Sequence, residues 1–314
     1  MQLAHDNNLQ ISLEPKLTII EQIEKLKAQG VEFKKCSQDE AKKFLEESSY
    51  YFKISIFKKL YNKQDGRYQG LDFAYLRELA NLDTKFRKVI LELCLTCEHV
   101  LKTRLNKHLS YNDRENGYDI VSEFLEEHKP AAFRQHERNK TGPYIKALMN
   151  EYYPRINKFA LWNFVEILSF AEFIEFLKFY QNRYRLFNTY IMNLSYICRI
   201  LRNVAAHNNA ILDTLKRNLA ENFQPNRKLV EKLQEKIVNR TDVQEKCRII
   251  IIHDFLAVIE LFTMICPIAM KNKIKNKCIL IFLDRLKQNI AYFETNLDLK
   301  DKIYFIDEAV RAII

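Results

Sequence analysis

The sequence predicts an all-α protein, and three observations support this fold class. The chain of 314 residues contains only 5 Gly and 6 Pro, fewer turn residues than a sheet protein of this length needs. Its apolar residues recur at spacings of three and four over long stretches, as on a helix with one buried face. Residues that can cap a helix stand directly before several of these stretches. The length and the hydrophobic content of 47% suit one large or two modest globular domains.

The first two predicted helices begin with capping boxes. Thr18 with Glu21 opens the first helix, and Ser37 with Glu40 opens the second. In each box a hydroxyl and a carboxylate three residues apart satisfy free backbone N–H groups. Gly30 is expected to end the first helix, because glycine readily adopts the left-handed conformation that follows a helix.

The middle of the chain is predicted to be helical with one looser insertion. An aromatic-rich segment at 50–70 is expected to be helical up to a turn at Asp65–Gly66. The longest continuous pattern occupies 71–109, with a break expected near 81–83. The segment 110–155 contains three prolines and a basic stretch, and we interpret it as a helical insertion between two core blocks.

The second core block, 156–180, is apolar on two sides and is expected to be central. A helix is then predicted from 191 to 215. Residues 1–215 are predicted to form the helical core, with an N-terminal helical segment included, and residues 216–314 to complete the same bundle. The most apolar window, 248–270, contains charged residues and a proline, which favours a buried helix over a membrane span.

Charge and cysteine usage indicate the kind of partner and the compartment. Lys and Arg number 50 against 40 Asp and Glu, and this net charge of +10 favours a polyanion such as nucleic acid as a partner. The 7 cysteines are odd in number and no signal peptide precedes them. We therefore expect reduced thiols in a cytoplasmic protein without membrane contact. Cys94 and Cys97 form a CxxC without a second pair, which favours packing over a metal or redox role.

One stretch, ILRNVAAHNN at 200–209, concentrates polar residues suited to catalysis. An ideal helix gathers its apolar residues into a stripe that must face the core. The stripe consists of Leu194, Ile197, Ile200, Leu201, Val204 and Ile211. Arg202 and His207 then lie on opposite borders of the polar arc. Asn203 and His207 are four residues apart, close enough for the amide to orient the imidazole.

These residue types suit cleavage of RNA by its own 2′-hydroxyl. His207 can take the hydroxyl proton or protonate the leaving oxygen, and Arg202 can hold the phosphate as negative charge builds up. No metal or other cofactor is needed, and the sequence shows no carboxylate cluster or His/Cys set suited to one. The reaction uses both an acid and a base, whereas one chain supplies a single such histidine. Two copies related by a two-fold axis would supply both.

The spacing of Arg202 and His207 does not by itself establish a site. Such a pair arises about once by chance in a chain of this composition, and Arg248 with His253 is a second match. Isoleucines fill the interval there, so we interpret that match as a core helix. Another pair, Arg104 and His108 in KTRLNKH, has one residue fewer between its two members than Arg202 and His207 have. On spacing alone, a solvated helix face is the favoured interpretation of 202–207.

Five segments between Pro15 and Leu212 match a known family in order and spacing. They are PKLTIIEQIEKLKAQGVEF, SYYFKISIFKKLY, LDTKFRKVILELCLTCEHVLKTRL, LWNFVEILSFAEFIEFLKFY and LRNVAAH. They contain D-x-x-x-R, E-x-x-x-x-[KRT]-R, W-x-x-x-E and R-N-x-x-x-H patterns. In these features the chain resembles the Abi-like (AbiD/AbiF, or Abi_2) family of bacterial phage-defence proteins, within the HEPN superfamily. It departs from the family at Ala171, where Gly is frequent, and in NNAIL after His207, where relatives tend to have a further His or Arg.

The resemblance implies a HEPN-like helical bundle with additional N-terminal, inserted and C-terminal helices. It also implies a ribonuclease site at a homodimer interface. Arg202 and His207 fall on the catalytic pair, and Asn203 on the polar residue after the arginine. The supporting positions of the family fall on Glu98, Arg104 and Glu166.

Each supporting residue also has a simpler interpretation. Glu98 and Arg104, which would otherwise orient Arg202, are more typical of surface or structural charges. Glu166 on an apolar helix suits a buried hydrogen bond as well as a functional role. Trp162 is expected in the core.

The resulting expectation is a metal-independent endoribonuclease that acts in phage defence, as a toxin or through abortive infection. Its partners would be substrate RNA, a second copy of the chain and a cognate small RNA or an antitoxin. Two alternatives stay open. One is a non-catalytic protein that binds a structured small RNA, and the other is a protein-binding regulator.

Overall fold

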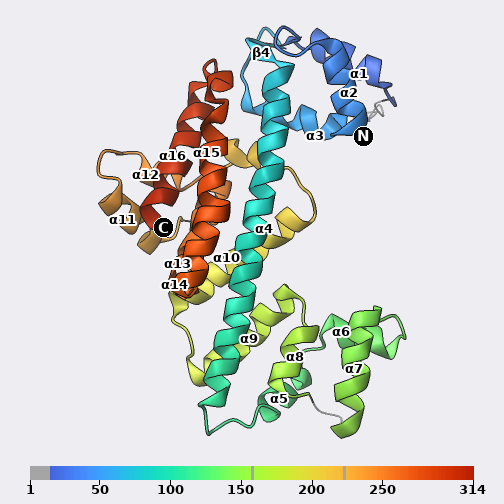
Figure 1. Ribbon diagram of the computed structural model, residues 1–314, viewed down its shortest axis with the longest axis vertical. Coiled ribbons are helices and arrows are strands. Elements are labelled where there is room, and N and C mark those ends of the chain that lie inside the picture. Colours follow the sequence, from blue (N-terminus) through green and yellow to red (C-terminus); the bar gives the residue numbers. More distant parts are fainter. Residues whose placement is uncertain (1–14, 157–158, 222–223) are drawn as a thin grey trace, which may run out of the picture. The chain divides into compact units, whose positions relative to one another are not determined.

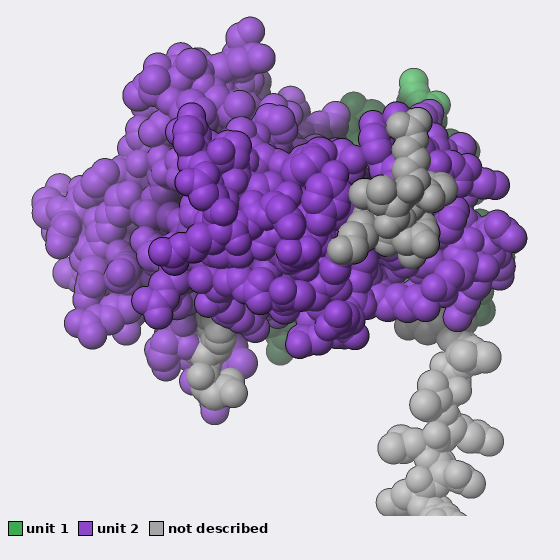
Figure 2. All heavy atoms as spheres, turned by 90° about the horizontal axis from the view of Figure 1, so that it is seen from below, with its two compact units in different colours: residues 1–80 green, residues 81–314 purple. Residues whose placement is uncertain are grey.

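The computed structural model describes residues 15–314 except 157–158 and 222–223. Helices dominate this part of the chain and its strands are two residues long, so the predicted all-α fold class is confirmed (Figure 1). The chain divides into two compact units, one up to Ala80 and one from Asn81 onward (Figure 2). Residues 216–314 belong to the same unit as the motif at 202–207.

The first unit begins with the two capped helices that the sequence predicts. Both α1 (Ile19–Ala28) and α2 (Gln38–Glu47) carry complete capping boxes. As expected, α1 ends just before Gly30, whose φ of 91° suits only glycine well. The short strand β1 (Val31–Glu32) follows and pairs in parallel with β4 (Leu71–Asp72).

The aromatic-rich segment is helical for a shorter distance than predicted. A short helix, α3 (Tyr51–Ser55), and the 3-10 helix η1 (Ile56–Leu60) precede a hairpin of β2 (Lys63–Gln64) and β3 (Arg67–Tyr68). Asp65–Gly66 forms the hairpin turn, and both residues have the positive φ that a type I′ turn requires. The predicted turn is confirmed, but the helix ends earlier because the residues that flank the turn pair as strands.

The long helix α4 (Phe73–Ser110) is continuous, so the break expected near 81–83 is wrong. Asparagine and aspartate are common helix caps, which is why these residues suggested a break. Leu82 and Asp83 are instead fully buried. Asp83 forms an ion pair with Arg87 one turn later, with 3.1 Å between Oδ2 and Nε. The carboxylate is thereby kept from competing for the backbone of its own helix.

The insertion and the second core block form a series of shorter helices. They are α5 (Asp119–Glu127), α6 (Ala131–Glu137), α7 (Pro143–Ile156), α8 (Leu161–Ile167) and α9 (Phe170–Tyr184). Ser169 forms a capping box with Glu172 and so separates α8 from α9. The rings of Phe124, Phe164 and Phe176 meet edge to face and join α5, α8 and α9.

The C-terminal part is built around one buried helix. Its elements are α10 (Thr189–Ala206), η2 (Leu212–Lys216), α11 (Arg227–Lys236), α12 (Val243–Lys246), α13 (Ile250–Ile265), α14 (Ile268–Ile274), η3 (Lys275–Ile279), α15 (Leu280–Gln288), η4 (Ile290–Phe293) and α16 (Leu297–Ile313). The buried helix is α13, which packs against α10, α11 and α16. The interpretation of 248–270 as a core helix is thus confirmed, and in the described ranges no helix has the length and apolarity to cross a bilayer.

Candidate functional site

The motif lies on α10, whose buried face differs from the predicted apolar stripe. The buried side chains of α10 are those of Ile191, Leu194, Ser195, Cys198, Leu201 and Ala205. Three of these are small, and one of them, Cys198, contacts Cys94 and Cys97 on α4. The main neighbour of α10 is α13. Ile200, which was expected in the stripe, is 40% exposed, and Ile197 and Val204 are only half-buried. Small residues as well as branched apolar ones pack against the core, so the buried face is rotated from the predicted stripe.

The helix that carries the motif ends at Ala206 and not at the predicted Leu215. His207 is its C-cap, and the backbone N–H of His207 donates to Asn203 O at 3.0 Å. Asn208 follows with a φ of 59°, the left-handed conformation that stops a helix. His207 therefore stands at a helix end and not within a helix.

Arg202 and Asn203 are in contact, whereas His207 stands apart from them. Arg202 Nη1 donates to Asn203 Oδ1 at 3.2 Å, and both side chains are half-buried. His207 is exposed, and its ring has no hydrogen-bond partner within the described residues. The amide oxygen of Asn203 is thus directed to Arg202 and does not orient the imidazole within one chain. His207 follows the exposed face of α10, which carries Tyr196 and Ile200, whereas Arg202 is half-buried on another side of the helix.

Arg202 lies on the side of α10 that faces α4. Burial raises the pKa of the Cys94 thiol on α4, contact with the Cys198 thiol raises it further, and the positive charge of Arg202 opposes this rise. Glu98, one turn after Cys94, forms its ion pair with Lys102 at 3.5 Å. Its second carboxylate oxygen, Oε2, is buried and has no hydrogen-bond partner in the part of the chain that is described. The predicted pairing of Glu98 with Arg202 is therefore not formed.

Arg104 and Glu166 do not join the motif either. Arg104 Nη2 donates to the backbone oxygen of Ile265, the last residue of α13, and so satisfies a carbonyl that the helix end leaves unpaired. Glu166 is exposed, and Trp162 on the same face of α8 is 46% exposed. The expected core position of Trp162 and the buried alternative for Glu166 are wrong, because other side chains supply the buried face of α8, namely Leu161, Phe164, Val165 and Ile167.

The histidines of the two other Arg–His pairs, His253 and His108, both form hydrogen bonds with protein groups. His253 is 1% exposed, and its Nε2 accepts the backbone N–H of Asn226 at 3.2 Å while Nδ1 lies 2.9 Å from Asp254 Oδ1. His108 Nδ1 lies 2.8 Å from the hydroxyl of Tyr180. The interpretation of the second match as core is confirmed. His207 differs from both, because its ring is exposed and has no hydrogen-bond partner in the part of the chain that the structure describes.

Asp83 and Arg87 hold the segment after the motif. They form the D-x-x-x-R pattern of the sequence, to which no role was assigned. Asp83 Oδ1 accepts the backbone N–H groups of Ile211 at 2.7 Å and Leu212 at 2.9 Å. The available signal was an acid and an arginine one turn apart on the buried face of α4. Its meaning was hidden because the partners lie 128 and 129 residues away.

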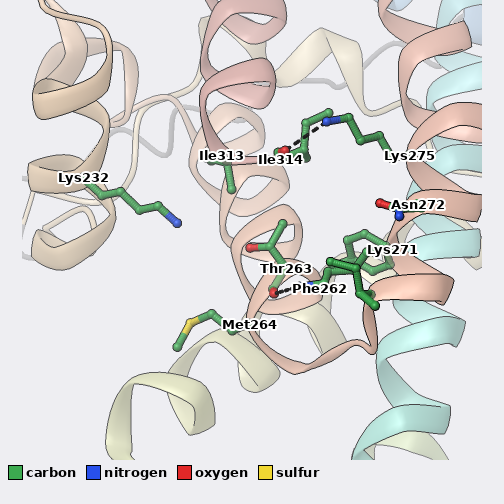
Figure 3. Close-up of a pocket in the computed structure, with 10 residues that line it drawn as sticks. Lys232, Phe262, Thr263, Met264, Lys271, Asn272, Lys275, Ile313 and Ile314 are labelled. Carbon is green, nitrogen blue, oxygen red and sulfur yellow. Dashed lines mark hydrogen bonds between the residues drawn. The ribbon is translucent and has the colours of Figure 1, made fainter.

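The candidate site is an exposed helix end rather than a pocket. A pocket of about 370 Å³ lies elsewhere, where Lys232, Lys271 and Lys275 surround residues of α13 and α16 (Figure 3). Lys271 Nζ donates to the backbone oxygen of Thr263, and Lys275 Nζ to that of Ile314. No residue of the motif lines this pocket. Over the described ranges, no group of three or more His, Cys, Asp or Glu side chains is arranged to hold a metal ion.

Comparison with known proteins identifies the family. A family model described as Abi-like protein matches residues 43–213, a range that includes both the motif on α10 and the Asp83–Arg87 pair. The comparisons with curated proteins and with solved structures found no match. Because the family match covers more than half of the chain, the chain belongs to the Abi-like protein family.

Proposed function

We propose that the protein is a metal-independent endoribonuclease of the HEPN type. Its family suggests a role in phage defence by abortive infection. The observation that carries the proposal is the C-terminal end of α10, where Arg202 and Asn203 are in contact and the exposed His207 ring has no hydrogen-bond partner among the described residues. A general acid or base must reach its substrate, and the histidines of the competing pairs are already bound to protein groups.

In the proposed reaction, RNA supplies its own nucleophile. His207 takes the proton of a 2′-hydroxyl, or donates a proton to the leaving 5′-oxygen. The 2′-oxygen bonds to phosphorus as the bond to the 5′-oxygen breaks, which leaves a 2′,3′-cyclic phosphate and a 5′-hydroxyl. Arg202 binds the phosphate as its negative charge grows. Asn203 orients Arg202, since its amide oxygen accepts a hydrogen bond from the guanidinium.

A second copy of the chain would supply the second histidine that an acid and a base together require. Tyr196 is 49% and Ile200 is 40% exposed on α10. At about 100° per residue, both side chains lie on the same face of the helix as His207. Exposed apolar residues beside a polar group are typical of an interaction surface. A two-fold contact through this face would bring the two His207 rings toward one composite site.

Cleavage of RNA in excess chelator tests the proposal. The purified full-length protein is expected to cut RNA and to leave cyclic phosphate ends. His207→Ala and Arg202→Ala are each expected to lower the rate by about 10²-fold or more. His99→Ala is the matched control, because His99 is an exposed histidine on α4 outside the motif. A His207→Ala variant that cuts as fast as the wild type, or a wild type that cuts no RNA, would refute the assignment.

Non-catalytic RNA binding is the second candidate function. The net charge of +10 favours it, as does the sequence NNAIL after His207, where related proteins tend to have a further His or Arg. It predicts salt-sensitive RNA binding, with no cleavage, that survives both His207→Ala and Arg202→Ala. Recovery of the protein from cells with a bound small RNA or an antitoxin would identify the natural partner. The lack of any RNA affinity would favour a protein-binding regulator instead.

A further inference from the structure

Asp83 connects α4 to the segment that follows the motif. Its side chain is fully buried, and Oδ1 accepts the N–H groups of Ile211 at 2.7 Å and Leu212 at 2.9 Å. These groups stand at the start of η2, where a helical turn leaves backbone N–H groups without partners of their own. The carboxylate therefore caps η2 from a different helix, in the way that an aspartate commonly caps its own.

Arg87 holds this carboxylate in place. Its Nε lies 3.1 Å from Asp83 Oδ2, and its Nη2 donates to Thr84 Oγ1 at 3.0 Å. Burying two charges is unfavourable, and two apolar side chains often pack equally well in such a place. Apolar side chains, however, cannot accept the hydrogen bonds of Ile211 and Leu212. The distinctive contribution of the pair is therefore the fixed start of η2.

The two hydrogen bonds of Asp83 hold the chain close to His207. His207 is tied to α10 through its own N–H, which donates to Asn203 O, and Ile211 is tied to Asp83. Only residues 208–210 lie between these two anchors, and Asn208 already occupies the restricted left-handed region. The backbone at His207 is thus held from both sides, and its side-chain direction depends on both anchors.

We propose that Asp83, held by Arg87, is a positioning residue that sets the direction of the His207 side chain. This inference rests on the proposed function, in which His207 transfers the proton. Asp83 is buried and does not itself touch the substrate. A misplacement of about 1 Å at a reacting group can lower a rate by about 10²-fold. RNA affinity should change little, because Arg202 lies within α10 and keeps its place.

Substitutions at Asp83 in the full-length chain separate positioning from stability. Asp83→Ala removes the acceptor and is expected to lower kcat by about 10²-fold with little change in KM. Asp83→Asn keeps an oxygen for Ile211 and Leu212, so it is expected to recover most of kcat. Asp307→Ala is the matched control. Asp307 is a buried acid of α16 that is ion-paired with Lys287 at 2.8 Å and Arg311 at 2.9 Å, and its loss should lower Tm while kcat stays unchanged.

The inference is overturned if Asp83→Ala keeps the wild-type kcat, or if Asp307→Ala loses kcat to the same extent. The nuclear magnetic resonance signals of the His207 ring, identified by their loss in His207→Ala, report the geometry without any cleavage. They are expected to shift in Asp83→Ala and to stay in place in Asp307→Ala. Unshifted signals in Asp83→Ala overturn the positioning role even if the protein cuts no RNA. A wild type that cuts no RNA but shows the shift refutes the proposed function alone. If Asp83→Ala does not fold, Asp83→Asn is compared in the same way, with smaller changes expected in the same direction.

Discussion

Arg87→Met removes the cation that faces Asp83 inside the second unit. Asp83 is completely buried and Arg87 exposes only 7% of its side chain, so solvent cannot replace the lost partner. Breaking such a buried pair costs about 3–5 kcal/mol, because the remaining charge stays in the interior. The carboxylate keeps its hydrogen bonds from Ile211 and Leu212. The expected loss of stability is therefore at the lower end of this range, about 3 kcal/mol. For a unit of this size, Tm should fall by about 6 °C, and urea denaturation should show a lower midpoint at an unchanged slope.

A surface pair with the same spacing supplies the control for this prediction. Arg227 and Glu231 are also four residues apart, with 2.7 Å between Nε and Oε1, but their side chains are 90% and 50% exposed. Exposed pairs of this kind contribute little, so Arg227→Met should leave the urea midpoint almost unchanged. The double variant Asp83→Asn/Arg87→Met should recover part of the loss, since no unpaired charge stays buried. If Arg87→Met is no less stable than Arg227→Met, the reasoning about the buried pair is refuted.

Further predictions concern the surface of α10, a helix cap and the response to acid. Ile200→Glu places a charge on the exposed face of α10 and is expected to give monomers in analytical ultracentrifugation; an unchanged dimer would contradict the proposed contact. Ser169→Ala should cost about 1 kcal/mol in urea denaturation, because the cap of α9 is lost, and Ser169→Asn should cost much less. Burial by itself raises the pKa of Asp301, but hydrogen bonds from Lys246 and Arg240 outweigh it and lower that pKa. These bonds therefore stabilise the fold at a pH above about 4, the pKa of aspartate in the unfolded chain. Their contribution is lost as the pH falls through the lower pKa that Asp301 has in the folded chain. Asp301→Asn should weaken the loss of stability in acid, and an equally acid-sensitive variant would contradict this.

Local sequence patterns predicted the elements whose hydrogen bonds are themselves local. The capping boxes at Thr18 and Ser37 mark helix starts because all their partners lie within three residues. Asp65–Gly66 marks a turn because its backbone conformation suits few other residues. The expected break near 81–83 failed for the opposite reason. Nothing near Asp83 in the sequence shows that its carboxylate is bound to backbone groups more than a hundred residues away.

The candidate site was predictable in composition but not in geometry. Arg202, Asn203 and His207 could be chosen from the sequence, since all three lie within six positions. The orientation of their helix could not, because serine, cysteine and alanine share its buried face with isoleucine and leucine, and an apolar pattern does not show that such small residues are buried. Ile200 is exposed for this reason. The end of α10 was not predicted either, because the apolar pattern continues to Leu215. In the structure the left-handed Asn208 ends the helix, and Asp83 binds the segment that follows.

Arg202 with His207 and Arg248 with His253 have the same spacing, yet their histidines have opposite surroundings. After His253 the apolar pattern continues, so the ring stays inside a buried helix and binds a backbone N–H group. After His207 two asparagines follow, and the first adopts the left-handed conformation that ends α10. What leaves His207 exposed, as the proposed proton transfer to RNA requires, is therefore the helix end and not the spacing. A helix end can also be placed against its own copy, whereas the middle of a buried helix cannot. The proposed composite site thus depends on the stop at Asn208 as much as on His207 itself.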